Sequence, residues 1–557
     1  MKTFSPKLFS ELKNYNVKTF TSDVIAGIIV AIIALPLSVA LAIASGVAPE
    51  KGLYTAIIAG FVIALLGGSK VNISGPTAAF ATIVAGVVAT YDIDGLVVAT
   101  IMAGVILILM GVFRLGGLIK YIPKTITTGF TSGIAVTIVI GQLKDFMGLT
   151  FPEGANAIET TEKLACVAES ISTINIQAVL VGIFSLVILI LWPKVSKKIP
   201  GSIIAVVVGT AIVKVFNMEV NTIGDLYTIS KSLPAFSVPQ VSFGMIKQLL
   251  PSAFTIAILA AIESLLSCVV SDGMISDKHN SNTELIAQGA GNIFSGLFGG
   301  IPATGAIART AANVKNGGKT PVAGIVHAVV LLLVLVLLMP YAAWIPMPVI
   351  AAVLFMVAYN MCEWRQFVKI CKIAPKSDIL VLVMTFVLTV VFDLVVAIEI
   401  GLLFTVILFM KRMTQVTHVR TWTPVDDAHD KDRERLKEIP EKTQVFEIDG
   451  PMFFATSDVV ASIPVKLDSK AVVLRMRNVP TLDVSALDTL TKVYDFCDKN
   501  KISVIFSHVN EQPLSVLKKS QFYDKVGEEK FAPNIDKALE LAEKICKEDF
   551  QTEQISG

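Results

Sequence analysis

Two segments of the sequence begin with a proline-containing turn and continue with small residues. One reads Ser74-Gly75-Pro76-Thr77-Ala78 and the other Pro302-Ala303-Thr304-Gly305-Ala306. Proline costs little at a helix start, because the first amides have no helical acceptor. Those free N–H groups and the positive end of the helix dipole attract anions. We therefore predict an anion site where the two helices begin, near Thr77 and Thr304; close packing of small residues is the alternative.

Two charged residues lie within apolar segments. Glu263 follows Ala260-Ala261-Ile262, and Arg309 lies about one turn into the second of the two helices. A charge inside a bilayer costs roughly 3 kcal/mol or more, so each should face a partner, water or a ligand. We expect Glu263 to carry a coupling proton and Arg309 to add positive potential at the anion site. A purely structural ion pair between the two is the alternative.

The first apolar run contains Pro36, which removes a helical hydrogen bond and bends or loosens the helix. Leu37, Ser38 and Leu41 would then line the ligand cavity, unless the bend serves only packing. His327 lies in another apolar run. We interpret it as a packed histidine rather than a proton relay.

The sequence gives little support for a metal site, a disulfide framework, a cofactor, an enzyme or a nucleic-acid partner. The six cysteines have no CxxC spacing, so we predict no metal site, no disulfide framework and no cofactor. No nucleophile, base and orienting group occur together, which argues against an enzyme. The formal net charge of +2 gives no reason to expect a nucleic-acid partner.

The composition indicates that membrane segments position these residues. Of 557 residues, 54% are hydrophobic and only 17% are charged, below the roughly 25% typical of soluble proteins. Apolar runs fill residues 19–413, so lipid is their expected surrounding. Fourteen runs are long enough for a full or half membrane segment, in two sets of seven. They lie near 24–44, 53–67, 77–90, 96–112, 125–143, 177–192 and 201–216, and near 251–270, 284–299, 304–314, 321–339, 346–360, 378–396 and 397–413.

The two proline-containing starts are third in each set. Short, Gly/Pro-interrupted segments at matching places in two halves are typical of a transport site. The basic residues predict the orientation, because cytoplasmic loops are rich in Lys and Arg. With a cytoplasmic N-terminus, inner loops contain Lys70, Arg114, Lys124, Lys278, Lys315, Lys319, Arg365 and Lys369. Outer loops are acidic, with Asp92, Asp94, Glu159, Glu162 and Glu169. Both termini are then cytosolic.

The chain resembles the sulfate permease (SulP) family of anion transporters. The matching stretches are Asp23–Leu41, Gly52–Thr55, Ser74–Thr77 and, most specific, Glu263–Asn313. The resemblance implies an α-helical membrane protein of two inverted seven-segment repeats, forming a core and a gate domain, and a homodimer. It also implies an elevator-like motion of the core. It places the anion against Leu37, Leu41, Thr77, Ala78, Ala306, Ala308 and Arg309, with Glu263 beside it.

The tail after residue 413 resembles the cytosolic α/β STAS domain that ends most members of the family. Predicted strands are 444–448, 452–455, 471–476 and 502–506, with helices at 485–500 and 535–546. Ser485 lies in a loop like the one phosphorylated in anti-sigma antagonist relatives; it is a candidate regulatory phosphosite or else a helix N-cap. The predicted division is a cytosolic N-terminal segment (1–18), a membrane domain (19–413), a linker (414–442), the STAS domain (443–548) and a tail (549–557).

The substrate is predicted from finer likeness. Leu37 after the proline, with the stretches around 46–56 and 262–274, is similar to bacterial C4-dicarboxylate transporters of the family. This favours proton-coupled uptake of succinate or fumarate across the inner (plasma) membrane. Arg309 makes sodium coupling less favoured. Sulfate or bicarbonate symport or exchange is the alternative, and an anion channel or a sensor acting through the STAS domain is the alternative of another class.

Overall fold

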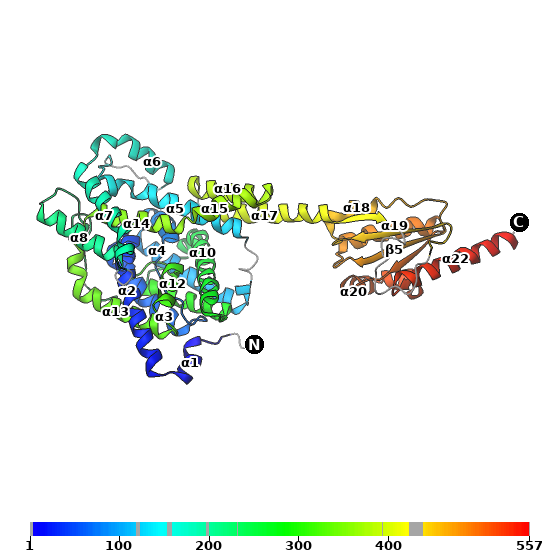
Figure 1. The fold of residues 1–557 in the computed structure, drawn as a ribbon, viewed down its shortest axis with the longest axis horizontal. Helices are drawn as coiled ribbons and strands as arrows, with labels where there is room; N and C mark the ends of the chain where they lie inside the picture. Colours follow the sequence, from blue (N-terminus) through cyan, green and yellow to red (C-terminus); the bar gives the residue numbers. More distant parts are fainter. Residues whose placement is uncertain are drawn as a thin grey trace. The chain divides into compact units, whose positions relative to one another are not determined.

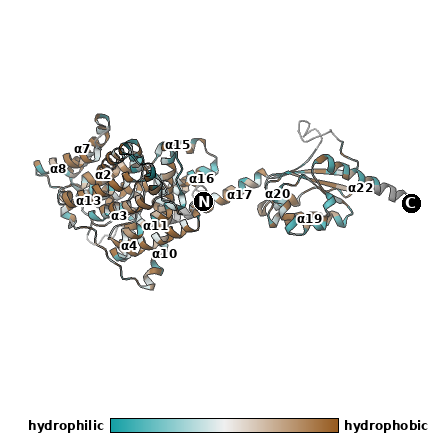
Figure 2. Cartoon of the chain, turned by 90° about the horizontal axis from the view of Figure 1, so that it is seen from below, coloured by the Kyte–Doolittle hydropathy of each residue, from teal (hydrophilic) through white to brown (hydrophobic). Residues whose placement is uncertain are grey.

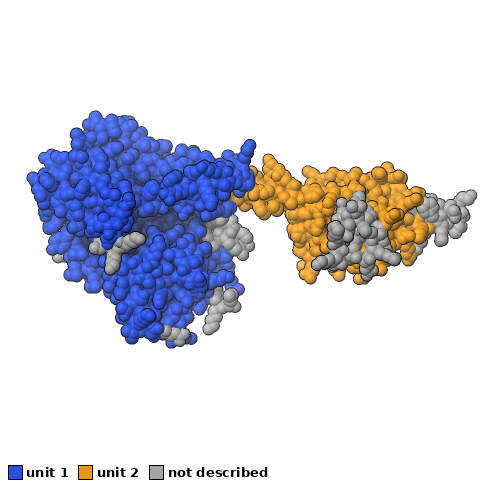
Figure 3. Space-filling model, viewed as in Figure 1, with its two compact units in different colours: residues 1–402 blue, residues 403–557 orange. Residues whose placement is uncertain are grey.

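A computed structural model describes residues 4–117, 123–152, 159–196, 200–230, 232–392, 394–422 and 438–555. The chain divides into two compact units, Met1–Leu402 and Leu403–Gly557 (Figure 3). The division falls inside the helix α17 (Leu394–Val416). The domain boundaries drawn from the sequence remain predictions.

Unit 1 is built from apolar helices, as the hydropathy colouring in Figure 2 shows. Eight of the described helices are long and apolar enough to cross a membrane. The first set of segments comprises α2 (Val17–Ala44), α3 (Pro49–Leu66), α4 (Ala81–Val112), α5 (Lys124–Met147), α7 (Ile176–Val195) and α8 (Gly201–Val215). The second comprises α10 (Phe243–Ile275), α11 (Ser281–Leu297), α12 (Ile307–Lys315), α13 (Val322–Ala342), α14 (Met347–Met361), α16 (Lys376–Val391) and α17.

The element order accommodates the fourteen predicted segments because α4 contains two of them. A left-handed residue, Asp92 with φ 56°, interrupts this helix between the third and fourth segments. The sequence analysis did not predict four short helices. One, α1 (Lys7–Glu11), precedes the first span, and the others lie between spans: α6 (Thr160–Glu169), α9 (Ile223–Leu226) and α15 (Trp364–Ile373). Helix α2 continues through Pro36 without ending.

The helices form two groups, a core domain and a gate domain. In the core, α11 packs against α3 and α4, α10 against α4 and α12, and α13 against α2 and α3. In the gate, α5 packs against α14 and α16, and α7 against α8 and α14. Figure 1 shows α3, α12 and α13 on one side of unit 1 and α5, α7 and α14 on the other.

Unit 2 contains a five-stranded sheet in the order β3-β4-β5-β6-β7. Only β3 pairs antiparallel; the others are parallel. The strands are β3 (His418–Thr421), β4 (Thr443–Asp449), β5 (Ala471–Asn478), β6 (Ser503–Ser507) and β7 (Phe531–Ala532). Helices α18 (Ser457–Ala461), α19 (Val484–Lys499), α20 (Glu511–Lys519) and α21 (Phe522–Val526) contribute to one hydrophobic core, and α22 (Ile535–Ile555) to another.

Two details of this unit differ from the sequence analysis. The predicted strand 452–455 was wrong: Met452 makes a single bridge to Leu482, and residues 454–456 form a 3-10 turn. The predicted linker 414–442 contributes strand β3; its residues 423–437 lie outside the described part. An edge strand of four residues that precedes a long charged stretch carries too little pattern to be recognised.

Candidate anion site

Two short strands bring the predicted helix starts together. β1 (Ser74–Gly75) and β2 (Thr304–Gly305) pair antiparallel, Ser74 opposite Gly305 and Gly75 opposite Thr304. The ladder therefore joins one strand from the first set of segments to one strand from the second set. After the strands, the 3-10 turn η2 (Ala78–Phe80) leads into α4, and α12 begins at Ile307. Because the strands run in opposite directions, the two helix N-termini flank the same short ladder.

The first amides of both helices are free. Within the described residues, the N–H groups of Ala78 and Ala79 on one side, and of Ile307 and Ala308 on the other, donate to no acceptor. The preceding amide of Ala306, by contrast, donates to the Ile73 carbonyl at 2.9 Å. Free amides at a helix N-terminus are donors for an anion. Ala308 is exposed and Ala306 half-buried, whereas Ala78 is buried, 5% exposed.

Glu263 on α10 contacts this site through Thr77. The Thr77 hydroxyl donates to Glu263 Oε2 at 2.8 Å, and both residues are half-buried. The alternative of an ion pair between Glu263 and Arg309 is wrong, because these two side chains form no ion pair with each other among the described residues. The carboxylate instead shares a hydrogen bond with the residue that begins the other half-helix.

Arg309 lies deeper than the sequence suggested. It is 1% exposed, and its Nη2 donates to the Pro76 carbonyl at 2.8 Å, while Nε and Nη1 have no partner within the described chain. A Cβ atom on Gly75 would lie 2.4 Å from Nη1, so glycine is needed there for the guanidinium to fit. Arg309 therefore links the start of α12 to the start of η2, and its positive charge lies next to Gly75 of β1.

Thr304 has a structural part. Its hydroxyl is fully buried, donates to the Ala260 carbonyl at 3.0 Å and lies 2.7 Å from the Ser264 hydroxyl. The Gly305 amide also donates to Ser264, at 3.0 Å. These contacts fasten β2 to α10 directly beside Glu263.

A polar network behind the strands was missed by the sequence analysis. Asn72 accepts from Ser267 at 2.8 Å and from Thr310 at 3.0 Å, and donates to Glu284 at 2.8 Å. Glu284 is 1% exposed and also accepts from the Gly68 amide and from Gln288. A carboxylate in the ninth apolar run is as unusual as Glu263 and could have been found by the same argument.

The residues that the sequence analysis predicts to line the ligand cavity lie on α2. Leu37 is half-buried and packs against the main hydrophobic cluster of unit 1, which contains residues of both domains, and against a second cluster of gate residues. Leu41 is 2% exposed within the main cluster, and the buried Ser38 hydroxyl has no partner within the described chain. His327 on α13 is fully buried next to Gly60.

Two protein-family models match this chain. The family model described as "Sulfate permease family" matches residues 20–385, and the STAS domain model matches residues 435–538. The chain belongs to the sulfate permease family. It is therefore a membrane transporter of anions, with a C-terminal STAS domain, and not an enzyme.

Relatives of this family member match over nearly their whole length. A "Putative sulfate transporter YvdB" from Bacillus subtilis is 39% identical over 529 residues, which is 94% of this chain and 98% of the relative. A "Bicarbonate transporter BicA" from Picosynechococcus is 32% identical, covering 94% and 95%. The solved structure of SLC26A9 has the same fold, with a TM-score of 0.85, 20% identity and coverage of 98% and 93%.

Proposed function

We propose that this family member takes up small anions by proton symport, with C4-dicarboxylates such as succinate or fumarate as its first substrates. One observation supports this above the others. The Glu263 carboxylate accepts a hydrogen bond from Thr77, which immediately precedes the free amides of η2, and the β1–β2 ladder joins this segment to the start of α12.

The Thr77–Glu263 hydrogen bond suggests how proton and anion are coupled. An ionised Glu263 repels an anion, and its carboxylate accepts the hydrogen bond that the Thr77 hydroxyl donates. Protonation removes the charge, and the Thr77 O–H can then turn toward the anion. Proton and anion thus bind together. The loaded site then carries one negative charge fewer than it would with the same anion beside an ionised Glu263. Arg309 holds its charge close by and stabilises the bound anion without touching it.

The wall of the site distinguishes the substrate candidates. Leu37 and Leu41 offer apolar contact that suits the two central carbons of a C4-dicarboxylate, while its carboxylates suit the two amide ends. Sulfate or bicarbonate, by symport or exchange, is the second candidate, because the relatives are named as transporters of these anions.

The remaining assignments belong to the same proposal. The core domain moves against the gate, the protein is a homodimer in the plasma membrane, and its N-terminus and STAS domain are cytosolic, as the basic loops indicate. Ser485 stays a candidate phosphosite. It is exposed at the second position of α19, while Asp483 caps that helix by accepting from the Ala486 amide, so the N-cap interpretation of Ser485 is wrong.

Uptake by the purified protein in liposomes tests this function. Radiolabelled succinate, fumarate, sulfate and bicarbonate are each offered with an inward proton gradient, with a sodium gradient, and with neither. We expect saturable succinate or fumarate uptake that the proton gradient accelerates. Non-saturating flux that ignores both gradients would indicate a channel, and no flux of any of the four would favour a sensor.

A further inference from the structure

A cavity lies in unit 1, away from the paired strands. It has a volume of about 240 Å³ and is lined by the end of α5, the segment 148–151, the start of α7, residues 220–221, α9 and the start of α14. These helix ends all lie on the face that the predicted orientation makes extracytoplasmic. Pockets for drug-sized ligands start at roughly 300 Å³, so this one suits only a small ligand.

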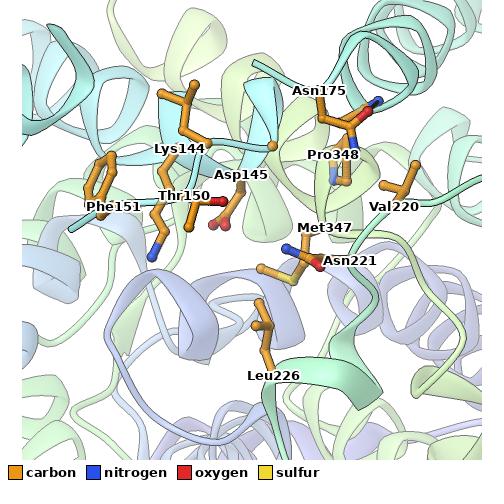
Figure 4. Close-up of a pocket in the computed structure, with 13 residues that line it drawn as sticks. Lys144, Asp145, Thr150, Phe151, Asn175, Val220, Asn221, Leu226, Met347 and Pro348 are labelled. Carbon is orange, nitrogen blue, oxygen red and sulfur yellow. Dashed lines mark hydrogen bonds between the residues drawn. The ribbon is translucent and has the colours of Figure 1, made fainter. Parts of the chain in front are cut away.

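Asp145 is the charged group at the centre of this cavity. In Figure 4 its carboxylate lies between Lys144 on one side and Met347 with Asn221 on the other. It makes no ion pair or hydrogen bond within the described structure. The ammonium of Lys144 lies over the Phe151 ring instead, 4.9 Å from its centroid. The adjacent basic residue therefore leaves the carboxylate unpaired.

The surroundings of Asp145 favour a cation. The C-terminal end of α5 adds the negative pole of its helix dipole, because Asp145 lies in the last turn of Lys124–Met147. Thr150 and Asn221 add neutral hydrogen-bonding side chains to the lining. Nearby, burial and then the charge of Asp145 raise the pKa of Tyr227 to about 12, so this phenol stays neutral. A half-buried carboxylate that has no partner within the described chain is stabilised by a bound cation.

The cavity also lies where the two domains are joined. Residues 217–230, here called the outer strap, form the first part of the connection from α8, the last helix of the first set, to α10. On the gate side the Met347 amide donates to the Asn221 carbonyl at 2.8 Å. Ile223 is buried in the main hydrophobic cluster of unit 1, which contains residues of both domains, and Tyr227 packs against that cluster. Just beyond the strap, the Tyr54 hydroxyl donates to the Ser232 carbonyl at 2.8 Å.

We propose that this cavity binds a compact ammonium group, with Asp145 as its counter-ion, and that the bound ligand slows transport. A primary ammonium has three N–H donors, which match the Asp145 carboxylate, Thr150 and Asn221. The ligand contacts the gate through Asp145 and Met347 and the strap through Asn221 and Leu226. Because it stabilises this one arrangement, it must leave before the core can move against the gate. The slowing rests on the proposed transport function, whereas the binding does not.

Binding is tested by calorimetric titration of the full-length protein in detergent with ethylammonium chloride. We expect saturable binding that Asp145→Asn weakens at least tenfold and Asp145→Glu largely retains. Glu169→Gln, which removes an exposed carboxylate of the same outer face, is the matched control and should bind as the wild type does. Tetramethylammonium, which has the charge but no N–H donors, should bind at least tenfold more weakly.

Three results would overturn the site. The first is that ethylammonium shows no saturable binding to the wild type, and the second is that Asp145→Asn binds it as tightly as the wild type does. The third is that the wild type binds tetramethylammonium as tightly as ethylammonium, a result that is independent of how any variant folds. The slowing is tested in liposomes by anion uptake with saturating ethylammonium on both sides of the membrane. We expect uptake to fall severalfold in the wild type and in Glu169→Gln but not in Asp145→Asn. Binding without slowing would overturn the regulatory part, and absence of any uptake would concern the proposed function alone.

Discussion

Arg309 and Gly75 pack closely together, since a Cβ atom at position 75 would lie 2.4 Å from Arg309 Nη1. The guanidinium occupies the space that a Cβ atom at position 75 would fill, and from there its Nη2 donates to the Pro76 carbonyl. The same contact aligns the two helix starts that make up the anion site. At the scale of single residues, the site therefore depends on the lack of a side chain at Gly75 as much as on the side chain of Arg309.

This pair leads to a first prediction. Gly75→Ala puts a methyl group 2.4 Å from Arg309 Nη1, so the guanidinium must leave Pro76 or the strand must shift. We expect anion uptake in liposomes to fall at least tenfold. Gly86→Ala is the control, since a Cβ there has no neighbour within 4 Å, and it should transport at the wild-type rate. Wild-type uptake by Gly75→Ala would contradict the positioning role of Arg309.

At the scale of elements, the start of α19 shows which residue holds a helix end. Asp483 accepts from the Ala486 amide at 2.8 Å and from the Phe454 amide at 2.9 Å, so it joins the helix to the preceding turn. Ser485 makes neither contact and is exposed. A phosphate on it would add nearly two negative charges to a helix N-terminus without disturbing the cap.

Asp483→Ala should therefore loosen this part of unit 2. Losing a cap costs about 1 kcal/mol, and the Phe454 amide loses its partner as well. We expect faster hydrogen exchange of the first turn of α19 in the full-length protein, by about fivefold or more. Ser485→Ala should leave that exchange rate unchanged, because its hydroxyl caps nothing. Equal exchange rates in all three proteins would show that Asp483 does not hold the helix.

The elements also show how far sequence reasoning reaches. The fourteen segments and the paired third and tenth segments could be predicted because hydropathy, Gly and Pro act locally. The partner of Glu263 could not be predicted, because Thr77 reaches it only through a β1–β2 pairing of residues more than 200 positions apart. The same holds for Asn72 and Glu284, whose network exists only once α11 and β1 are packed together.

At the scale of the whole molecule, the compact units divide within α17, beyond every residue of the candidate site. The contacts that build the site, from Leu37 to Arg309, all lie within Met1–Leu402. The site should therefore form without the STAS domain, which would act on rate or expression.

Removing residues 414–557 tests this division. We expect the truncated protein to retain succinate affinity within about threefold of the full-length value, while its uptake rate or its amount in the membrane falls. Equilibrium binding of radiolabelled succinate, normalised to the folded protein, separates affinity from amount. Complete loss of binding by a folded truncation would contradict a purely regulatory tail.

The central claim is that anion and proton move together through Glu263. The most direct measurement follows the pH inside liposomes that contain a trapped pH-sensitive dye while succinate is added outside. The account predicts that the wild type acidifies the lumen as succinate enters. Glu263→Gln should not acidify it, but should still exchange internal for external succinate in part. Acidification by Glu263→Gln at the wild-type rate, or succinate uptake by the wild type without acidification, would contradict it.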